Sequence, residues 1–305
     1  MKLRWTSIAW SVAYLLLLLS LKSPLLVITS FFILLPSVVL YTILPFRSFV
    51  MHIVPVLAIV GFLAGPSSLI LSILFLIPSL IMGRLYKKRA SAFRTIITGS
   101  IVILVEFLLL LLFSTMLFDF DLSHVVENMM NMSAAPIEGM STETLASSLG
   151  WSQDMVEQLS ALTVRSLPFT LTVCALVTAT IAHAIARPTL ASLGVVVPKL
   201  APLRTWKLPR ALVWYYLLAL LIGMFRDGNG TSYVDTILLN ITPMLGFCFM
   251  IQTASFFFFL AHSRKWNPII PIVLIIVMLF FQPLRILGIL DMVFPLRDKI
   301  SRSGR

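Results

Sequence analysis

Glu106 is the residue of this sequence with the clearest potential for chemistry. It lies inside an apolar run, with five apolar residues before it and seven after it. A carboxylate at the depth of a bilayer costs at least ~3 kcal/mol to insert, so it normally faces protein or water and is kept for a purpose. We expect Glu106 either to bind a substrate or carry a proton, or to form a structural ion pair with Arg285. His183 or a bound cation are the other partners that it could have.

A second group of polar residues lies in the last two apolar runs. Asn240 and Gln252 share one run but project about 120° apart at 100° per residue, so they form no single cluster. Interhelical hydrogen bonding is the usual role of such amides, and substrate binding is the alternative. Gln282 and Arg285 share a helical face, where they would line a polar cavity with Asp291 at its mouth. The candidate substrate-binding residues are therefore Glu106, Asn240, Gln252, Gln282 and Arg285.

Basic residues between the apolar runs form a third candidate group. In the stretch 187–210, prolines recur every four to seven residues from Pro198 to Pro209, which excludes a continuous helix and favours an extended backbone. Trp206 stands between two cations, a combination that settles at the lipid headgroups. We expect lipid contact here, or docking of a cytoplasmic partner, through the following residues: Arg84, Lys87, Lys88, Lys199, Arg204, Trp206 and Lys207.

Motifs of several enzyme classes are missing from the sequence. There is no Gly-x-Ser-x-Gly, no His-Glu-x-x-His, no phosphate loop and no dinucleotide fingerprint. The histidines and the two cysteines show no metal-ligand spacing. We expect neither an enzyme nor a cofactor or metal, although Glu106 leaves an intramembrane enzyme open. The net charge of +11 comes without basic stretches interleaved with aromatics, so nucleic acid is not an expected partner.

The elements that carry these residues are apolar runs of membrane-spanning length. Hydrophobic residues make up 59% of the chain, and a transmembrane helix needs ~20 apolar residues. The sequence predicts an all-α, polytopic membrane bundle, one domain over 1–305, with a tight helical hairpin at 65–68. It has eight transmembrane segments, or nine if the last run crosses, at about 5–20, 25–46, 50–65, 67–83, 96–118, 167–187, 210–226, 236–262 and 269–294.

The charges between these runs alternate in sign along the chain. The N-terminus and four of the intervening loops carry fifteen Lys/Arg and no acid, whereas the loops that alternate with them carry nine acids and three bases. Because basic loops stay in the cytoplasm, the N-terminus and 187–210 are predicted to be cytoplasmic and 119–166 to be outside. A single crossing of 269–294 would put the basic tail outside. We expect the run to turn back around Gln282-Pro283 instead, which keeps the tail inside.

The outer loop 119–166 is predicted to contain an amphipathic helix. Ser152 can cap its first turn, and Met155, Val156, Leu159 and Leu162 recur at helical spacing. Such a helix would lie on the bilayer or cap the bundle. It is either a surface linker or a lid over a pocket that opens outward.

Three stretches resemble the YybS-like family of bacterial membrane proteins. They are Gly61 to Ser68 leading to Ile77–Arg84, then Leu193–Pro209, and finally Asn240 with Ile251–Ala254 and the ending from Leu287 to Arg297. That family looks like a distant relative of the substrate-binding (S) components of energy-coupling-factor transporters and of the rod-shape protein MreD. The resemblance implies a compact helical bundle in a bacterial plasma membrane.

Two functions follow from the resemblance and the polar residues together. The first is small-molecule binding or transport, with an outward pocket near Glu106, Gln252 and Arg285, and a coupling subunit as partner. The alternative is a scaffold that does not transport and that recruits cell-envelope proteins through 84–94 and 187–210.

Overall fold

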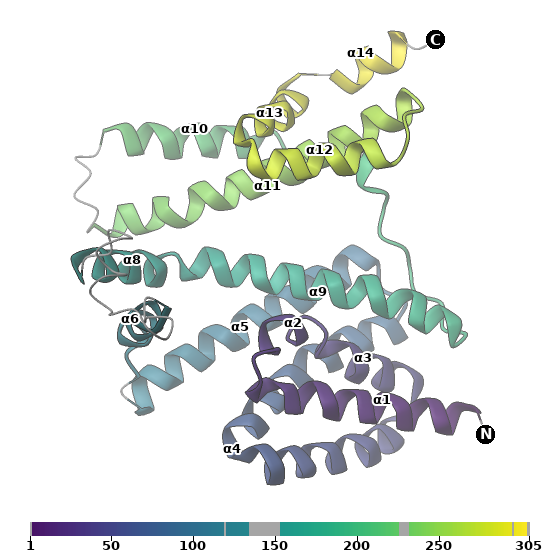
Figure 1. The fold of residues 1–305 in the computed structure, drawn as a ribbon. Helices are drawn as coiled ribbons and strands as arrows, with labels where there is room; N and C mark the ends of the chain where they lie inside the picture. The colour runs from purple at the N-terminus through teal and green to yellow at the C-terminus, as the bar shows by residue number, and fades with distance from the viewer. Residues whose placement is uncertain (1, 119, 134–152, 226–231, 295, 304–305) are drawn as a thin grey trace, which may run out of the picture. The chain divides into compact units, whose positions relative to one another are not determined.

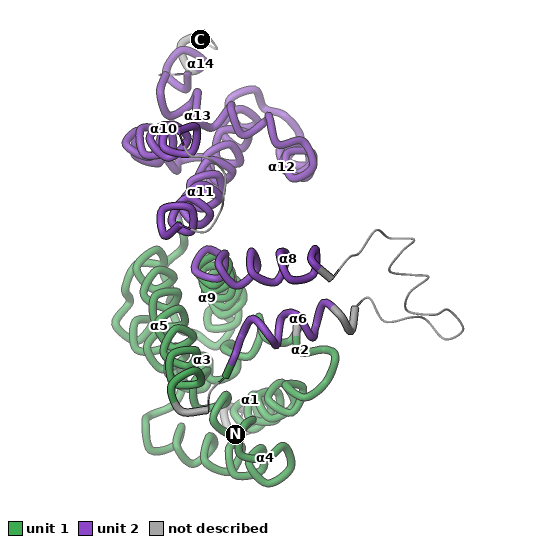
Figure 2. Tube along the Cα trace, turned by 90° about the vertical axis from the view of Figure 1, so that its left-hand side faces the viewer, with its two compact units in different colours: residues 1–120, 170–200 green, residues 121–169, 201–305 purple. Residues whose placement is uncertain are grey.

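The computed structural model describes residues 2–118, 120–133, 153–225, 232–294 and 296–303. Its regular elements within these ranges are all helices, as expected for a helical membrane bundle. They form two compact units (Figure 2). Unit 1 comprises Met1–Phe120 and Thr170–Leu200, and unit 2 comprises Asp121–Phe169 and Ala201–Arg305.

Unit 1 is built around a short helix that is buried on most of its surface. This helix, α3 (Leu34–Ile43), has eight buried residues and packs against α1 (Lys2–Leu19) and α4 (Phe46–Lys87) (Figure 1). Serines fasten it, since the Ser37 Oγ donates to Ser79 Oγ at 2.8 Å. The run 25–46 is therefore not one straight span. It is divided into α2 (Leu26–Thr29) and α3, and α3 serves as a core element.

The predicted hairpin at 65–68 is confirmed inside α4. Gly65 has φ 81° and ψ 176°, a conformation that only glycine adopts readily. The two limbs of α4 fold back on each other at this glycine. Their close approach is evident at Gly61, where an added Cβ would lie 3.3 Å from Leu69 Cδ2. The short helix η1 (Ser20–Lys22) and helices α5 (Ala92–Phe118) and α9 (Leu167–Ser192) complete the described helices that enter unit 1.

Unit 2 is organised along α11 (Tyr233–Ser263). A capping box starts this helix: the Val234 N–H donates to Ser232 Oγ at 3.2 Å, and the Ser232 N–H donates to Asp235 Oδ2 at 3.1 Å. The helices around it are η2 (Leu203–Thr205), α10 (Ala211–Met224), α12 (Ile269–Phe280), η3 (Gln282–Arg285), α13 (Ile286–Val293) and α14 (Leu296–Ser303).

The last apolar run turns sharply at the predicted place. Between α12 and the helical segment Gln282–Val293 the chain bends by 120°. A proline right after Gln282 favours such a break, because it cannot donate a backbone hydrogen bond. Beyond the bend, Gly288 allows α13 to approach α11 closely. A Cβ at Gly288 would lie 2.6 Å from the Phe249 carbonyl oxygen.

Five helices of the described chain are long and apolar enough to cross a membrane, and six if the bent pair forms one span. Two shorter apolar helices, α3 and α10, accompany them. The larger expected number of eight or nine counts the two limbs of α4 and both short helices as separate segments. Each expected run does coincide with a helix or a broken pair of helices.

The loop 119–166, which is predicted to lie outside, contains α6 (Leu122–Ser133) and α8 (Gln153–Arg165), and these two helices pack side by side (Figure 2). On the predicted apolar face of α8, Val156 is buried, whereas Met155, Leu159 and Leu162 are exposed. The amphipathic helix is thus present with only part of its apolar face covered. The expected cap at Ser152 lies outside the described residues.

Candidate functional site

Unit 2 contains a buried ion pair between Asp291 and Arg297. Their side chains are 0% and 6% exposed, and Arg297 Nη2 lies 2.7 Å from Asp291 Oδ2. The Arg297 Nε adds contacts of 3.0 Å to both carboxylate oxygens. Helix α14 presents Arg297 to α13, where Asp291 is located. A fork of this kind fixes the geometry of both side chains.

Arg297 also fastens the extended segment that precedes α10. We call residues 201–209 the strap. Arg297 Nη1 donates to the Arg204 carbonyl oxygen at 2.8 Å, and Nη2 donates to Ser255 Oγ at 3.0 Å. The Ser255 hydroxyl then donates to the carbonyl oxygen of Trp206 at 2.8 Å. One guanidinium therefore joins the strap to α11, α13 and α14.

Gln252 is the second anchor of the strap. It is 1% exposed. Its Oε1 accepts the Leu208 backbone N–H at 2.9 Å, while its Nε2 donates to Asp291 Oδ2. Both ends of the amide are occupied by protein groups. Gln252 was a candidate substrate-binding residue, and the structure places it in the network that holds the strap.

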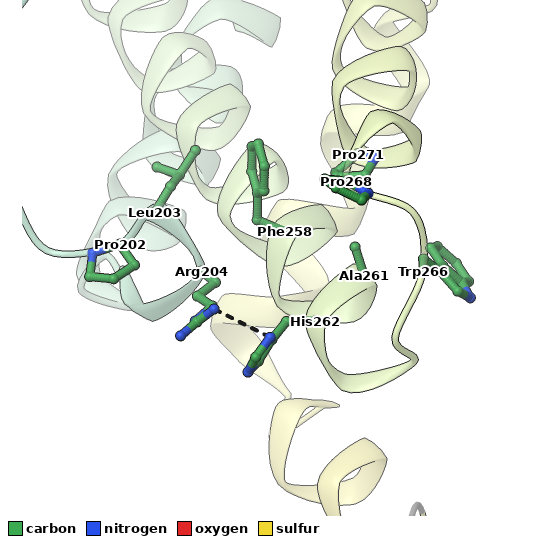
Figure 3. Close-up of a pocket in the computed structure, with 9 residues that line it drawn as sticks. All are labelled: Pro202, Leu203, Arg204, Phe258, Ala261, His262, Trp266, Pro268 and Pro271. Atoms are coloured by element: carbon green, nitrogen blue, oxygen red, sulfur yellow. Dashed lines mark hydrogen bonds between the residues drawn. The ribbon is translucent and has the colours of Figure 1, made fainter. Parts of the chain in front are cut away.

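The strap forms one wall of a surface groove of about 370 Å³ (Figure 3). Phe258, Ala261 and His262 of α11 form another wall, and the turn into α12 closes it. Arg204 and His262 point toward each other, with Arg204 Nη1 donating to His262 Nδ1 at 3.2 Å (Figure 3). The lining residues are Pro202, Leu203, Arg204, Phe258, Ala261, His262, Trp266, Pro268 and Pro271.

The groove has a largely apolar lining with one cation. Within the described lining, Arg204 is the only residue with a full charge, and the exposed cations Lys207, Arg264 and Lys265 are close to lining residues in the sequence. No acid belongs to the described lining. This arrangement suits an apolar side chain that is accompanied by carboxylates.

Glu106 lies on α5 of unit 1 and is half-buried. Its Oε1 is buried and has no hydrogen-bond partner among the described residues. The cavity beside it, between α4 and α5, measures about 10 Å³, which is space for about one water molecule. Its possible partner Arg285 belongs to unit 2, where the Arg285 Nε is likewise buried without a described partner.

Asn240 joins three segments at one end of α11. Its Nδ2 donates to the carbonyl oxygens of Arg165 and Thr236, both at 2.8 Å, and its Oδ1 accepts the Phe169 N–H at 2.9 Å. The side chain closes the junction between α8 and α9. The contacts to Arg165 and Phe169 are interhelical hydrogen bonds, the alternative to substrate binding, whereas the contact to Thr236 lies within α11.

The residues that were expected to line a polar cavity around the bend at 282 have different surroundings in the structure. Gln282 is exposed and Arg285 is half-buried in η3. Asp291 does not lie at a cavity mouth, because Arg297 and Gln252 enclose its carboxylate. The prediction missed this pairing because it used the basic tail only to assign the side of the membrane on which the tail lies.

The basic candidates divide between the two units. In unit 1, Arg84 and Lys88 are exposed, while Lys87 Nζ donates to the Leu44 carbonyl oxygen at 2.9 Å and lies 4.3 Å from the Tyr41 ring centroid. In unit 2, the Trp206 indole N–H donates to the Ala201 carbonyl oxygen at 2.9 Å, within the strap itself.

Sequence reasoning missed Ser255, His262 and Arg297. One signal for Arg297 was present: the acid Asp291 ends an apolar run and a base follows six residues later. An acid at the end of a membrane segment needs a nearby cation. Ser255 and His262 left no signal of this kind.

Comparisons with known proteins agree with a membrane protein. A family model described as "Predicted membrane protein (DUF2232)" matches residues 11–292. The chain is 24% identical over 257 residues to a Bacillus subtilis (strain 168) protein named "Uncharacterized protein YybS". The aligned region covers 81% of this chain and 80% of that protein. No solved structure matches.

Proposed function

The chain belongs to the DUF2232 family of predicted membrane proteins, and we propose that it acts as a membrane scaffold that binds a protein partner. The observation that carries the proposal is the groove beside the strap. It measures about 370 Å³, whereas the cavity at Glu106 measures about 10 Å³. The first can receive side chains of a partner as it stands. The second cannot receive a metabolite without movement of α4 and α5.

The strap supports this function because its backbone is fixed before a partner arrives. Arg297, Ser255 and Gln252 bind its carbonyl oxygens and one N–H from inside unit 2. A surface that is already ordered loses little conformational entropy on binding, so more of the contact energy appears as affinity. The predicted topology places the strap in the cytoplasm.

The lining defines the chemistry of the partner. An aromatic or aliphatic side chain would fill the space lined by the prolines and Phe258, and carboxylates next to it would pair with Arg204. We therefore expect a partner segment in which one large apolar residue has acidic neighbours. A cell-envelope protein with a cytoplasmic segment of this kind is the expected partner.

Site-specific photocrosslinking tests the proposal. A photoreactive phenylalanine analogue is placed at Phe258 in the groove, and at the exposed Ile276 of α12 as a control. We expect a discrete protein adduct at position 258 only. We expect R204E to abolish this adduct, because the new carboxylate at position 204 would repel the carboxylates of the partner. Equal adducts at both positions, or an adduct at 258 that R204E leaves unchanged, would contradict the scaffold proposal.

A second candidate, small-molecule binding or transport, is favoured by one observation. Glu106 Oε1 is buried and has no described partner, and buried polar atoms without partners are uncommon. Native mass spectrometry of the purified protein and of E106Q tests this function. A small molecule carried by the wild type and lost from E106Q would support it, and identical spectra would count against it.

A further inference from the structure

Unit 1 has a pocket of about 260 Å³ whose ionisable lining residues, as described, are two cations and one imidazole. It lies between α5, α9 and the segment that follows α9. Neither proposed function uses it. Its lining residues are Ile96, Thr180, His183, Ala184, Arg187, Lys199 and Leu200.

His183 turns one ring nitrogen to a tyrosine and leaves the other without a partner. Its Nδ1 lies 2.8 Å from the Tyr86 hydroxyl oxygen, and Tyr86 is 1% exposed. The Nε2 is buried and has no hydrogen-bond partner among the described residues. When the tyrosine hydroxyl donates to Nδ1, the hydrogen of the neutral ring is on Nε2, which then needs an acceptor.

Arg187 and Lys199 bring two positive charges to the same pocket. Arg187 follows His183 by four residues and shares its helical face. Its Nε is buried with no described partner. Lys199 reaches the pocket because the chain reverses after α9 at Gly194, which has φ 83°. The described lining contains no acid that could pair with either cation.

The contrast with unit 2 is informative. There, the buried arginine is matched by an internal carboxylate, and its guanidinium hydrogen bonds are taken up by protein oxygens. In unit 1, a guanidinium Nε and an imidazole nitrogen are desolvated with no acceptor. Donors that are desolvated without an acceptor are costly to a fold unless a ligand supplies the oxygens. An oxyanion in the pocket would supply such acceptors.

We propose that this pocket binds the phosphate group of an anionic phospholipid. Phosphate oxygens would accept from Arg187, Lys199 and His183 Nε2 together. The apolar lining by Ile96, Ala184 and Leu200 suits the glycerol and the start of an acyl chain, so a lipid is favoured over a free phosphate ester. The predicted topology puts this end of α9 at the cytoplasmic face, where anionic headgroups attract cations.

Lipid binding to the purified full-length protein tests the proposal. The protein in neutral detergent is titrated with phosphatidylglycerol, with phosphatidylcholine and with inorganic phosphate, and bound species are counted by native mass spectrometry. We expect phosphatidylglycerol to bind, and R187Q and K199Q each to weaken this binding roughly tenfold, because each removes a charge-assisted hydrogen bond. The control R94Q removes one exposed charge from the same unit and is expected to leave binding unchanged.

Each outcome has a defined meaning. Phosphatidylglycerol binding that R187Q and K199Q weaken, and that inorganic phosphate does not displace, establishes the headgroup site. Displacement by inorganic phosphate would identify a site for free phosphate instead. Equal binding by K199Q, R187Q and R94Q would overturn the proposal. Because Lys199 is exposed, K199Q keeps the test valid if R187Q fails to fold.

Discussion

Replacing Arg297 with glutamine removes the cation that faces the buried carboxylate of Asp291. The Asp291 side chain is 0% exposed and that of Arg297 is 6% exposed, so solvent cannot replace the lost charge. The substitution also deprives the Arg204 carbonyl oxygen and Ser255 Oγ of their donor. The strap then loses one direct hydrogen bond, and Ser255, which holds the Trp206 carbonyl oxygen, loses its own donor.

Burial and the hydrogen bonds set the expected magnitude. Removing one partner of a buried ion pair costs about 3–5 kcal/mol, because the other charge stays in a medium of low dielectric constant. The lost hydrogen bonds to the Arg204 carbonyl oxygen and Ser255 Oγ come from a charged donor and add about 1.5–3 kcal/mol each, of which the glutamine recovers part. We expect R297Q to lower the free energy of unfolding by at least ~4 kcal/mol.

A double-mutant cycle in mixed micelles measures this effect. The free energy of unfolding is obtained by titration with sodium dodecyl sulfate, followed by circular dichroism, for wild type, D291N, R297Q and D291N/R297Q. The double variant removes both charges, so we expect it to be more stable than R297Q alone. R264Q removes an exposed cation of the same unit and is expected to change stability by less than ~0.5 kcal/mol.

Two results would refute this reasoning. One is an R297Q variant within ~1 kcal/mol of the wild type, which would mean that the carboxylate is hydrated or neutral. The other is a double variant whose cost equals the sum of the two single costs, because that would leave no coupling between the two side chains.

Substitutions at Gly288, Gly65 and Asn240 test the packing further. G288A is expected to cost more than ~2 kcal/mol in the same titration, since its Cβ would lie 2.6 Å from a backbone oxygen. The control G223A would place its Cβ where no atom lies within 4 Å, so it is expected to be neutral or stabilising by up to ~1 kcal/mol. Equal effects of the two substitutions would refute the close approach of α13 to α11. G65A is expected to cost ~1–3 kcal/mol because alanine resists φ 81°, and a neutral effect would mean that the hairpin bends elsewhere. N240A leaves the Phe169 N–H without its acceptor and the Arg165 carbonyl oxygen without this donor; it is expected to cost ~1–3 kcal/mol, and a neutral effect would refute the assigned contacts.

Local chemistry explains which parts of the fold were predictable. The dipeptides Gly65-Pro66 and Gln282-Pro283 each combine residues that interrupt a helix, and both turns lie where they were expected. The runs of hydrophobic residues likewise marked the helices. Each of these inferences needs only the conformational limits of a few neighbouring residues and the length that a helix needs to cross a bilayer.

The contacts that hold the strap could not be inferred in this way. Gln252 and Leu208 are 44 residues apart, and Arg297 and Arg204 are 93 apart. Hydropathy says how apolar a segment is but not which face meets which neighbour. The role of Gln252 as an interhelical hydrogen-bonding residue was therefore open, and its partners were unknown. The broken span at α3 escaped for the same reason, since burial inside protein and burial in lipid select the same residues.

The substrate role expected of Glu106 stays a prediction, and so does its pairing with Arg285. These residues lie in different units. What the structure adds is a buried carboxylate oxygen next to a cavity of about 10 Å³. The orientation of the N-terminus in the membrane also stays a prediction from loop charge.

The 93 residues that separate Arg204 from Arg297 have a consequence for biogenesis. At a synthesis rate of ~5–20 residues per second, the strap leaves the ribosome about 5–20 s before the arginine that fastens it. During that interval α11 and α12 enter the membrane while the strap is held at most by Gln252 and Ser255. The contacts of the strap are therefore complete only after nearly all of the described residues of unit 2 have been synthesised. A ribosome that stalls before Arg297 leaves a chain whose strap is accessible to proteases and chaperones.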